Sequence, residues 1–266
     1  MKKEVLSFIT LLLIGATTVL AVLLINEKRA KLASPMSETD SATAAITKYE
    51  LPTLKSVREV VELPAPKLKS SVSVEQAIQS RRSRRYFSEE PVTKQELSQV
   101  LWSAQGITDE AGHRAAPSAR SAYPFSVYVV IRNVEDIPAG LYLYNPKDNS
   151  LGSLGLANAG DRLIEAKVQE NSQKSPVVVA LVAAPAIMQA IAPDNDPMPN
   201  IYLEAGHIGE NIYLQIESLK MATVVTGGFN KQAVASALEL DPLNEVVVYL
   251  VPFGHIGEAP EQAATE

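Results

Sequence analysis

The chain has 266 residues, of which 46% are apolar and 20% are charged. This balance is ordinary for a globular enzyme and excludes both a polytopic membrane protein and a disordered chain. A formal net charge of -6 excludes a general nucleic-acid-binding surface, because neutralising phosphates requires clustered excess Lys and Arg. The sequence contains no Cys, which excludes disulfides, thiolate metal sites and thiol redox chemistry.

The N-terminal residues 5–25 carry no charged side chain, and about twenty apolar residues are enough to span a bilayer. They stay bulky up to Ile25, whereas a cleaved signal peptide usually has a shorter apolar region and a small-residue cleavage site. We therefore expect residues 1–31 to form a single-pass membrane anchor, with a cleaved signal sequence as the alternative. Lys and Arg lie on both flanks, so the side of the membrane on which the remaining chain lies stays open.

Residues 32–71 are rich in Ser, Thr, Ala, Pro and Lys, and Pro52, Pro64 and Pro66 interrupt any regular element. This composition predicts a stalk or an extended arm. The short stretch 57–63 within it is compatible with a turn of helix or with a strap on the domain, and we leave it unassigned. We expect one globular domain over residues 72–258 and a flexible tail over residues 259–266.

The first half of this domain shows clear helix and strand signals. Ser73 is placed as the N-cap of a short helix that runs into the basic residues 81–85. Thr93 and Glu96 have the spacing of a capping box, which predicts a helix that ends at Gly106. The β-branched stretch 125–131 predicts a buried strand, and residues 140–144 predict a strand that pairs with 151–156 as a hairpin.

The second half alternates helices and strands. It predicts a helix from about 158 to 169, a strand buried on both faces over 176–184, a long helix over 200–219, a strand over 222–226, a short helix over 231–238 and a last strand over 245–253. The long helix has an apolar stripe and a partly apolar opposite face, which indicates a place at the centre of a domain or in a subunit interface. The order of elements predicts an α+β domain.

Four arginines in the five-residue window 81–85 are the strongest local charge feature. A solvated charge run is about as consistent with this pattern as a binding site. Ser83 adds a hydroxyl donor, and Tyr86 and Phe87 tie the run to the core. Because Arg side chains can fork onto a phosphate, and only some of the four can point the same way, we expect one phosphate-bearing ligand here.

Two further segments are candidates for ligand contact. In residues 114–124, small side chains would let the backbone approach a flat ligand, and hydroxyls offer hydrogen bonds. Gly227 and Gly228 follow a predicted buried strand and can aim backbone N–H groups at a ligand, although a simple turn explains them as well. Gly-His-Ile-Gly-Glu occurs at 206–210 and at 254–258. Only the first copy lies in a convincing helix, so we expect no metal site. No Gly-x-Ser-x-Gly motif is present, which disfavours a hydrolase.

Five motifs between about 74 and 257 together resemble the nitroreductase family. They are Arg-Arg-Ser-x-Arg at 81–85, Pro-Ser-Ala at 117–119 followed by Tyr-Pro, Glu-Ala-Gly-His-x-x-x-Asn at 204–211, Gly-Gly-Phe at 227–229 and Leu-Val-Pro-Phe-Gly at 250–254. The Pro-Ser-Ala loop, taken with residues 140–144, is similar in particular to the SagB-type dehydrogenase branch.

The resemblance implies an α+β fold with a mixed central sheet flanked by helices, in which two subunits of a homodimer share two FMN sites. By position, the residues that would contact FMN are Arg81, Arg82, Ser83, Arg85, Pro117, Ser118, Ala119, Gly227, Gly228 and His255. Residues 81–85 would hold the phosphate, the ribityl chain and the pyrimidine edge, and the loop 117–119 would reach the flavin of the other subunit. Two residues depart from the family pattern: Arg120 stands where Gly is usual, and His255 where a basic phosphate ligand is common.

The function implied by the resemblance is that of an FMN-dependent oxidoreductase. It would transfer hydride from NADH or NADPH, through the flavin, to a nitroaromatic, a quinone or a similar conjugated acceptor. Two alternatives stay open: a SagB-type dehydrogenase that oxidises a peptide-derived heterocycle, and a catalytically silent, membrane-tethered flavin-binding module. The sequence assigns no catalytic acid or base.

Overall fold

The computed structural model describes residues 57–259. The predicted membrane anchor, most of the predicted stalk and nearly all of the predicted tail lie outside the described residues. Between residues 57 and 259, no helix combines the length and the apolar character needed to cross a membrane.

Seven strands form one sheet in the order β1-β4-β3-β2-β5-β7-β6. They are β1 (Glu59–Glu62), β2 (Phe125–Ile131), β3 (Gly140–Asn145), β4 (Ser150–Ser153), β5 (Val177–Ala183), β6 (Ala222–Thr223) and β7 (Val246–Gly254). The α+β class is confirmed. The sheet was expected to be mixed, and the pairings between its seven named strands are all antiparallel. All seven residues of β5 are buried, as expected for a strand between β2 and β7 with both faces covered.

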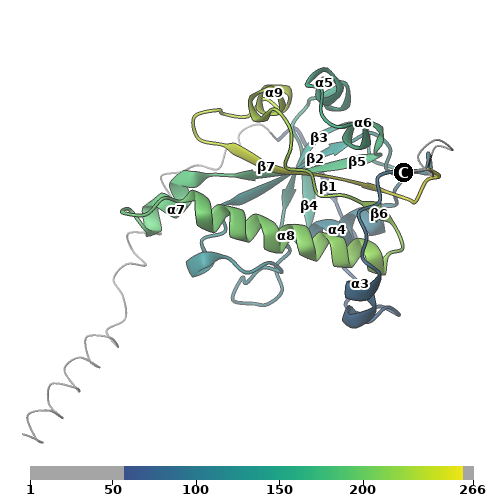
Figure 1. Ribbon diagram of the computed structural model, residues 1–266, viewed down its shortest axis with the longest axis horizontal. Helices are drawn as coiled ribbons and strands as arrows, with labels where there is room; N and C mark the ends of the chain where they lie inside the picture. Colours follow the sequence, from purple (N-terminus) through teal and green to yellow (C-terminus); the bar gives the residue numbers. More distant parts are fainter. Residues whose placement is uncertain (1–56, 260–266) are drawn as a thin grey trace, which may run out of the picture. The chain divides into compact units, whose positions relative to one another are not determined.

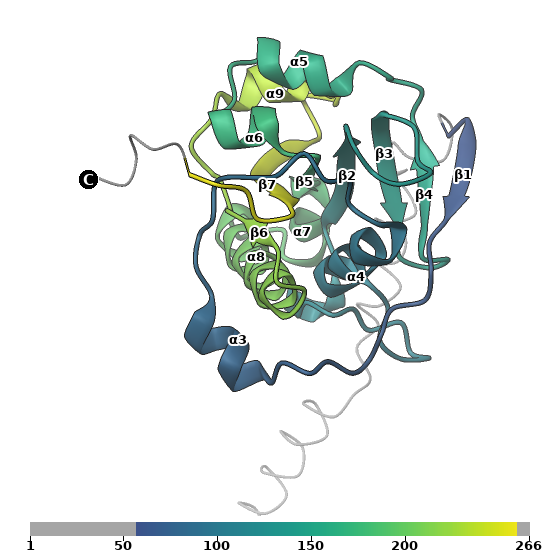
Figure 2. The same cartoon turned by 90° about the vertical axis from the view of Figure 1, so that its right-hand side faces the viewer.

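Helices cover both faces of the sheet (Figures 1 and 2). One face carries α4 (Lys94–Gln105), α7 (Pro185–Ile191) and α8 (Met198–Ser218), and the other carries α5 (Ala159–Glu165), α6 (Glu170–Lys174) and α9 (Lys231–Ala237). Alternate residues of β2 point to opposite sides: Val127 and Val129 join the cluster beneath α4 and α8, whereas Tyr128 and Val130 join the cluster beneath α5 and α9. The short helix α3 (Val74–Ser80) packs against α8.

The predicted helix starts are confirmed by their hydrogen bonds. Ser73 Oγ accepts from Gln76 N, and the Gln76 side chain accepts from Ser73 N, so α3 begins with a complete capping box. Thr93 and Glu96 form the same reciprocal pair at the start of α4. Two otherwise unpaired backbone N–H groups are satisfied at each of these ends.

The helix predicted over 158–169 is present but ends earlier than predicted. α5 ends at Glu165, Lys167 has a φ of 53°, and a separate short helix, α6, begins at Glu170. Arg132 occupies the junction from the sheet side: its guanidinium donates to the carbonyl oxygens of Gly160, Ser172 and Ser175. Because one partly buried side chain satisfies carbonyl groups of both helices, the break is stabilised by tertiary contacts that the local sequence does not reveal.

The strand predicted over 222–226 is shorter than expected. Only Ala222 and Thr223 pair with β7 in the regular ladder, and Thr226 returns to it as an isolated bridge to Leu250. Between them, Val225 N donates to the hydroxyl of Tyr213 on α8 at 2.9 Å. Successive N–H groups of a strand point to opposite sides, and Thr226 N bonds Leu250 O of β7, so the N–H of Val225 points away from β7 and is satisfied by a side chain of α8.

Residues 57–71 correct the boundary drawn between stalk and domain. β1 pairs with β4 from Glu59↔Ser153 to Glu62↔Ser150, which places it at the edge of the sheet. After it, Leu63 is 9% exposed and belongs to the core beneath α4 and α8. The structured domain therefore begins before residue 72, and the stretch left unassigned at 57–63 is a strand followed by a core residue.

We predict that Leu63→Ala lowers the free energy of unfolding by about 2–3 kcal/mol, because it leaves a cavity in the core. Val60→Ala is the matched control: Val60 lies in the adjacent strand but is 60% exposed, so its loss should change stability by less than about 0.5 kcal/mol. Urea denaturation of both variants provides the measurement. Equal effects would show that residues 57–63 are not anchored in the core.

Candidate functional site

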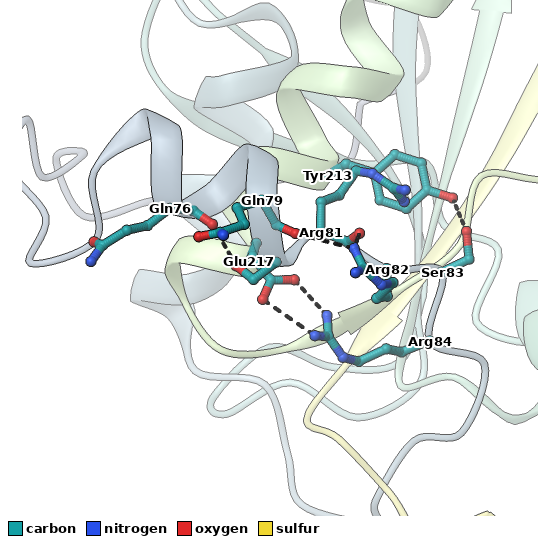
Figure 3. A network of polar contacts seen from close by, with 9 residues as sticks. Gln76, Gln79, Arg81, Arg82, Ser83, Arg84, Tyr213 and Glu217 are labelled. Atoms are coloured by element: carbon teal, nitrogen blue, oxygen red, sulfur yellow. Dashed lines mark hydrogen bonds and ion pairs between the residues drawn. The ribbon is translucent and has the colours of Figure 1, made fainter.

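Three segments that are far apart in the sequence meet beside the C-terminal half of α8. They are the basic run 81–85 after α3, α8 itself, and the segment that follows β6. Arg84 N donates to Thr223 O at 2.9 Å, and the Tyr213 hydroxyl bonds both Ser83 and the backbone of Val225. Residues 81–85, Tyr213 and Glu217 of α8, and the segment 224–228 thus share one surface, which we call the wall. Figure 3 shows Arg81, Ser83 and Tyr213 of this wall.

The arginines of the run have different surroundings. Arg84 forms a bidentate ion pair with Glu217, with Nη1–Oε2 at 2.5 Å and Nη2–Oε1 at 3.2 Å. Arg82 donates to the carbonyl oxygens of Gln79 and Arg81. Arg81 lies over the ring of Tyr213, and Arg85 is exposed. Arg84 therefore has a structural partner, whereas neither Arg81 nor Arg85 forms an ion pair with a carboxylate of residues 57–259.

Tyr213 is a residue of this wall that the sequence reasoning missed. Its hydroxyl lies 2.9 Å from Ser83 Oγ, accepts from Val225 N at 2.9 Å, and its ring centroid lies 5.1 Å from Arg81 Cζ. A signal was available in the sequence, because Tyr213 and Glu217 are four positions apart and therefore share one face of α8. That face is directed toward the basic run.

The glycine pair is open on one side. Gly227 and Gly228 are exposed, and Gln169 Nε2 donates to Gly228 O at 3.3 Å. A Cβ at Gly227 would lie 3.4 Å from the Tyr249 ring, and a Cβ at Gly228 would lie 3.7 Å from Gln169. Both are ordinary van der Waals distances, and neither glycine has the positive φ that demands glycine. Internal packing thus does not require glycine here, whereas the close approach of a ligand would.

His255 is directed toward α4. Its Nε2 lies 3.4 Å from Glu96 Oε2, and its carbonyl oxygen accepts from Ser88 N. A neighbouring carboxylate disfavours a bound phosphate through like-charge repulsion. The role of His255 as a phosphate ligand stays a prediction, and its surroundings give it less support than those of Arg81 and Arg85.

The loop 117–119 lies at the other end of α8. Ser118 Oγ donates to Glu204 Oε2 at 2.5 Å and accepts from Tyr123 N at 2.9 Å. Glu204 and Tyr213 are nine positions apart, which is about 14 Å along a helix. Within one chain the structure therefore places this loop apart from the basic run.

The backbone of this loop explains the first departure from the family pattern. Arg120, Ser121 and Tyr123 have positive φ values of 53°, 53° and 48°. Glycine adopts this region at no steric cost, which accounts for the usual Gly at position 120. The Arg120 side chain donates to Ile191 O at the end of α7, at 2.9 Å.

Glu204 is a buried carboxyl group at the centre of a polar network. It is 2% exposed, and burial raises its pKa to about 7, while Ser118, Arg114 and Gln105 act in the opposite direction. Arg114 donates to Gln105 Oε1 at 2.8 Å and lies over the ring of Tyr123. The network thus joins the end of α4, the loop and α8.

The pKa of Glu204 predicts a pH-dependent stability. The folded state holds this proton more tightly than the unfolded state, whose ordinary value is 4.5. The stabilisation is complete below about 4.5 and is lost as the pH rises through about 7, on the order of 3 kcal/mol in total. Glu204→Gln should lack this pH-dependent stabilisation. In urea titrations, the free energy of unfolding of the wild type should therefore fall relative to that of the variant as the pH rises from about 4.5 to about 7.

The control for this prediction is Glu210→Gln, which removes an exposed carboxylate from the same helix. It should show no such shift. A wild-type minus Glu204→Gln difference that is constant from pH 4.5 to pH 8 would contradict the elevated pKa.

The fold and the site define an antiparallel α+β domain with an arginine-bearing wall suited to a phosphate ligand. The model of the nitroreductase family matches residues 78–255, a range that contains every predicted site residue. The chain therefore belongs to the nitroreductase family.

Individual relatives agree with this assignment. A protein of Methanocaldococcus jannaschii that is assigned as a nitroreductase is 29% identical over 196 residues, which are 74% of this chain and 97% of the relative. A crystal structure from Ralstonia eutropha, also assigned as a nitroreductase, has a TM-score of 0.67 and 27% identity, with coverage of 78% of this chain and 94% of that chain.

A third relative was crystallised with a cofactor. It is a protein from Desulfovibrio desulfuricans in complex with FMN, with a TM-score of 0.50 and 20% identity, and the match covers 73% of this chain and 96% of that chain. At this identity the likeness shows the fold. The nitroreductase-like fold expected from the sequence motifs is confirmed.

Proposed function

We propose that this protein is an FMN-dependent oxidoreductase that transfers hydride from NADH or NADPH to a nitroaromatic, a quinone or a similar conjugated acceptor. The observation that carries the proposal is the wall on which Arg81, Ser83 and Arg85 lie next to the segment leading to Gly227 and Gly228. Membership of the nitroreductase family and the FMN complex of a structural neighbour support the same cofactor.

The residues of this wall fit the chemistry of FMN. Arg81 and Arg85 supply positive charge, and Ser83 supplies a hydroxyl, which together suit a phosphate. The two glycines leave their backbone accessible, with no side chain to hold a flat ring away. A phosphate group at one end and a planar group at the other are the two features that these residues can recognise.

We further propose that the protein acts as a homodimer. The loop 117–119 lies about 14 Å along α8 from the basic run, so it would meet the cofactor held by a second copy of the chain. The outer side of α8 exposes Tyr202 at 49% and Leu203 at 63%. Exposed apolar residues on a central helix suit a subunit interface.

In this mechanism FMN, when bound, would supply the redox chemistry by taking up a hydride and passing it on. The chain's own contribution is binding and orientation. Arg81 and Arg85 would neutralise the phosphate, Ser83 would donate to it, and the backbone N–H groups of the glycine pair would face the ring. The proposal assigns no side chain as a proton donor or acceptor.

For localisation we propose a single-pass membrane anchor within residues 1–31, which lie outside the described residues. The uncharged stretch 5–25 is the basis for it.

The proposed function predicts that the purified full-length protein shows flavin absorbance bands and that these bleach when NADH or NADPH is added without oxygen. Reoxidation by a nitroaromatic or a quinone should restore them. Bands that persist with both nicotinamides would favour the SagB-type dehydrogenase or the silent module instead. A protein that neither contains nor takes up FMN would refute the proposal.

We also predict that Arg81→Ala combined with Arg85→Ala yields a folded protein with less than about a tenth of the wild-type FMN content, because each lost charge-assisted hydrogen bond to a phosphate contributes about 1.5–3 kcal/mol. Arg162→Ala with Lys174→Ala is the matched control. It removes two positive charges from α5 and α6, where both side chains form surface ion pairs. Bound flavin per chain, measured after gel filtration, distinguishes the two variants. Full FMN content in the first double variant would refute the phosphate assignment.

A further inference from the structure

We propose that Tyr213 is a positioning residue that holds Ser83 and Arg81 in place for the phosphate of the cofactor. This inference rests on the proposed function and adds to it a residue outside the predicted cofactor contacts. Tyr213 reaches the basic run from α8, so a side chain of the central helix sets the geometry of a segment 130 positions earlier in the chain.

The hydroxyl of Tyr213 determines how Ser83 presents its proton. The phenol oxygen accepts the N–H of Val225 at 2.9 Å and keeps its own proton, which it can donate to Ser83 Oγ at 2.9 Å. Since a serine hydroxyl has one proton and two acceptor lone pairs, this bond leaves the Ser83 proton available for a phosphate oxygen. Without Tyr213 Oη, the Ser83 side chain would lose the contact that selects its rotamer.

The ring of Tyr213 acts on Arg81. The Arg81 guanidinium carbon lies 5.1 Å from the ring centroid, a distance at which the negative face of the ring attracts the cation. In Figure 3, Arg81 lies beside the ring, whereas Arg84 extends to Glu217 one helical turn further on. The fixed Arg84–Glu217 pair holds the backbone of the run against α8, which leaves the ring to orient Arg81.

The same hydroxyl also accepts the N–H of Val225 in the segment that leads to the glycine pair. The next residue, Thr226, exchanges two backbone hydrogen bonds with Leu250 of β7, at 2.8 and 2.9 Å. The approach to Gly227 is therefore held by β7 without Tyr213, and the phosphate side of the site, with Ser83 and Arg81, is the part that depends on the phenol.

The test is a double-mutant cycle in the full-length protein, with FMN binding to the apoprotein followed by flavin fluorescence. Tyr213→Phe removes the hydroxyl and keeps the ring, so Arg81 retains its contact. We expect Tyr213→Phe and Ser83→Ala each to weaken FMN binding about tenfold. The double variant should be no more than about threefold weaker than either single variant, because both changes remove the same interaction. Tyr142→Phe, which removes a hydroxyl that donates to Pro138 O in the β3 region, should bind FMN like the wild type.

Riboflavin, which lacks the phosphate, provides the second readout. If Tyr213 acts through the phosphate contacts, Tyr213→Phe should weaken FMN binding and leave riboflavin binding unchanged. Three results would each overturn the positioning role. They are losses of FMN affinity that multiply in the double variant, equal losses of affinity for FMN and riboflavin, and wild-type FMN affinity in Tyr213→Phe. These results differ from failure of the proposed function, in which the wild-type protein itself would not bind FMN and both proposals would fall.

Discussion

Helix α8 packs on the sheet through a stripe that includes Ile201, Ile208 and Ile216, all of which are buried. Burying this stripe fixes the rotation of the helix about its axis, because turning it would expose apolar area worth about 25 cal/mol per Å². Once the rotation is fixed, Glu204 must face the loop 117–119, and Tyr213 must face the basic run. The candidate site thus depends on core packing that contains none of its ligand-binding residues.

The two ends of α8 hold their segments with different chemistry. At the N-terminal end, a buried carboxyl group bonds Ser118, and its stability contribution changes with pH. At the C-terminal end, the neutral hydroxyl of Tyr213 and the Arg84–Glu217 ion pair hold the run 81–85. At the C-terminal end of α8, Glu217 neutralises one of the four arginines of the run 81–85. The surface where an anion is proposed to bind therefore keeps a net positive charge.

The sequence predicts the elements whose signals are local. α4 has its capping box, β5 has its apolar run, and α8 has its apolar stripe, and all three occur within about two residues of their predicted bounds. The predicted bounds are wrong where a side chain or strand far away in the sequence determines where an element begins or ends. Arg132 stabilises the break between α5 and α6, and β6 and β1 find their partners β7 and β4 about thirty and about ninety positions later. The spacing of apolar residues and the helix or strand propensities of a short stretch of sequence contain no information about these contacts.

The same limit applies to the site. The motif residues are recognisable from the sequence, but which arginine of the run is paired follows only from the position of Glu217.

At Arg120, a departure that is visible in the sequence is explained by the structure. A non-glycine residue at a φ of 53° costs roughly 1–2 kcal/mol, which its hydrogen bond to Ile191 O offsets in part. Because its side chain is anchored on α7, the departure at position 120 is accommodated by the fold, and it is not a reason to infer an inactive module. The surroundings of His255 are different, since the adjacent Glu96 leaves Arg81 and Arg85 as the stronger candidates for binding the phosphate.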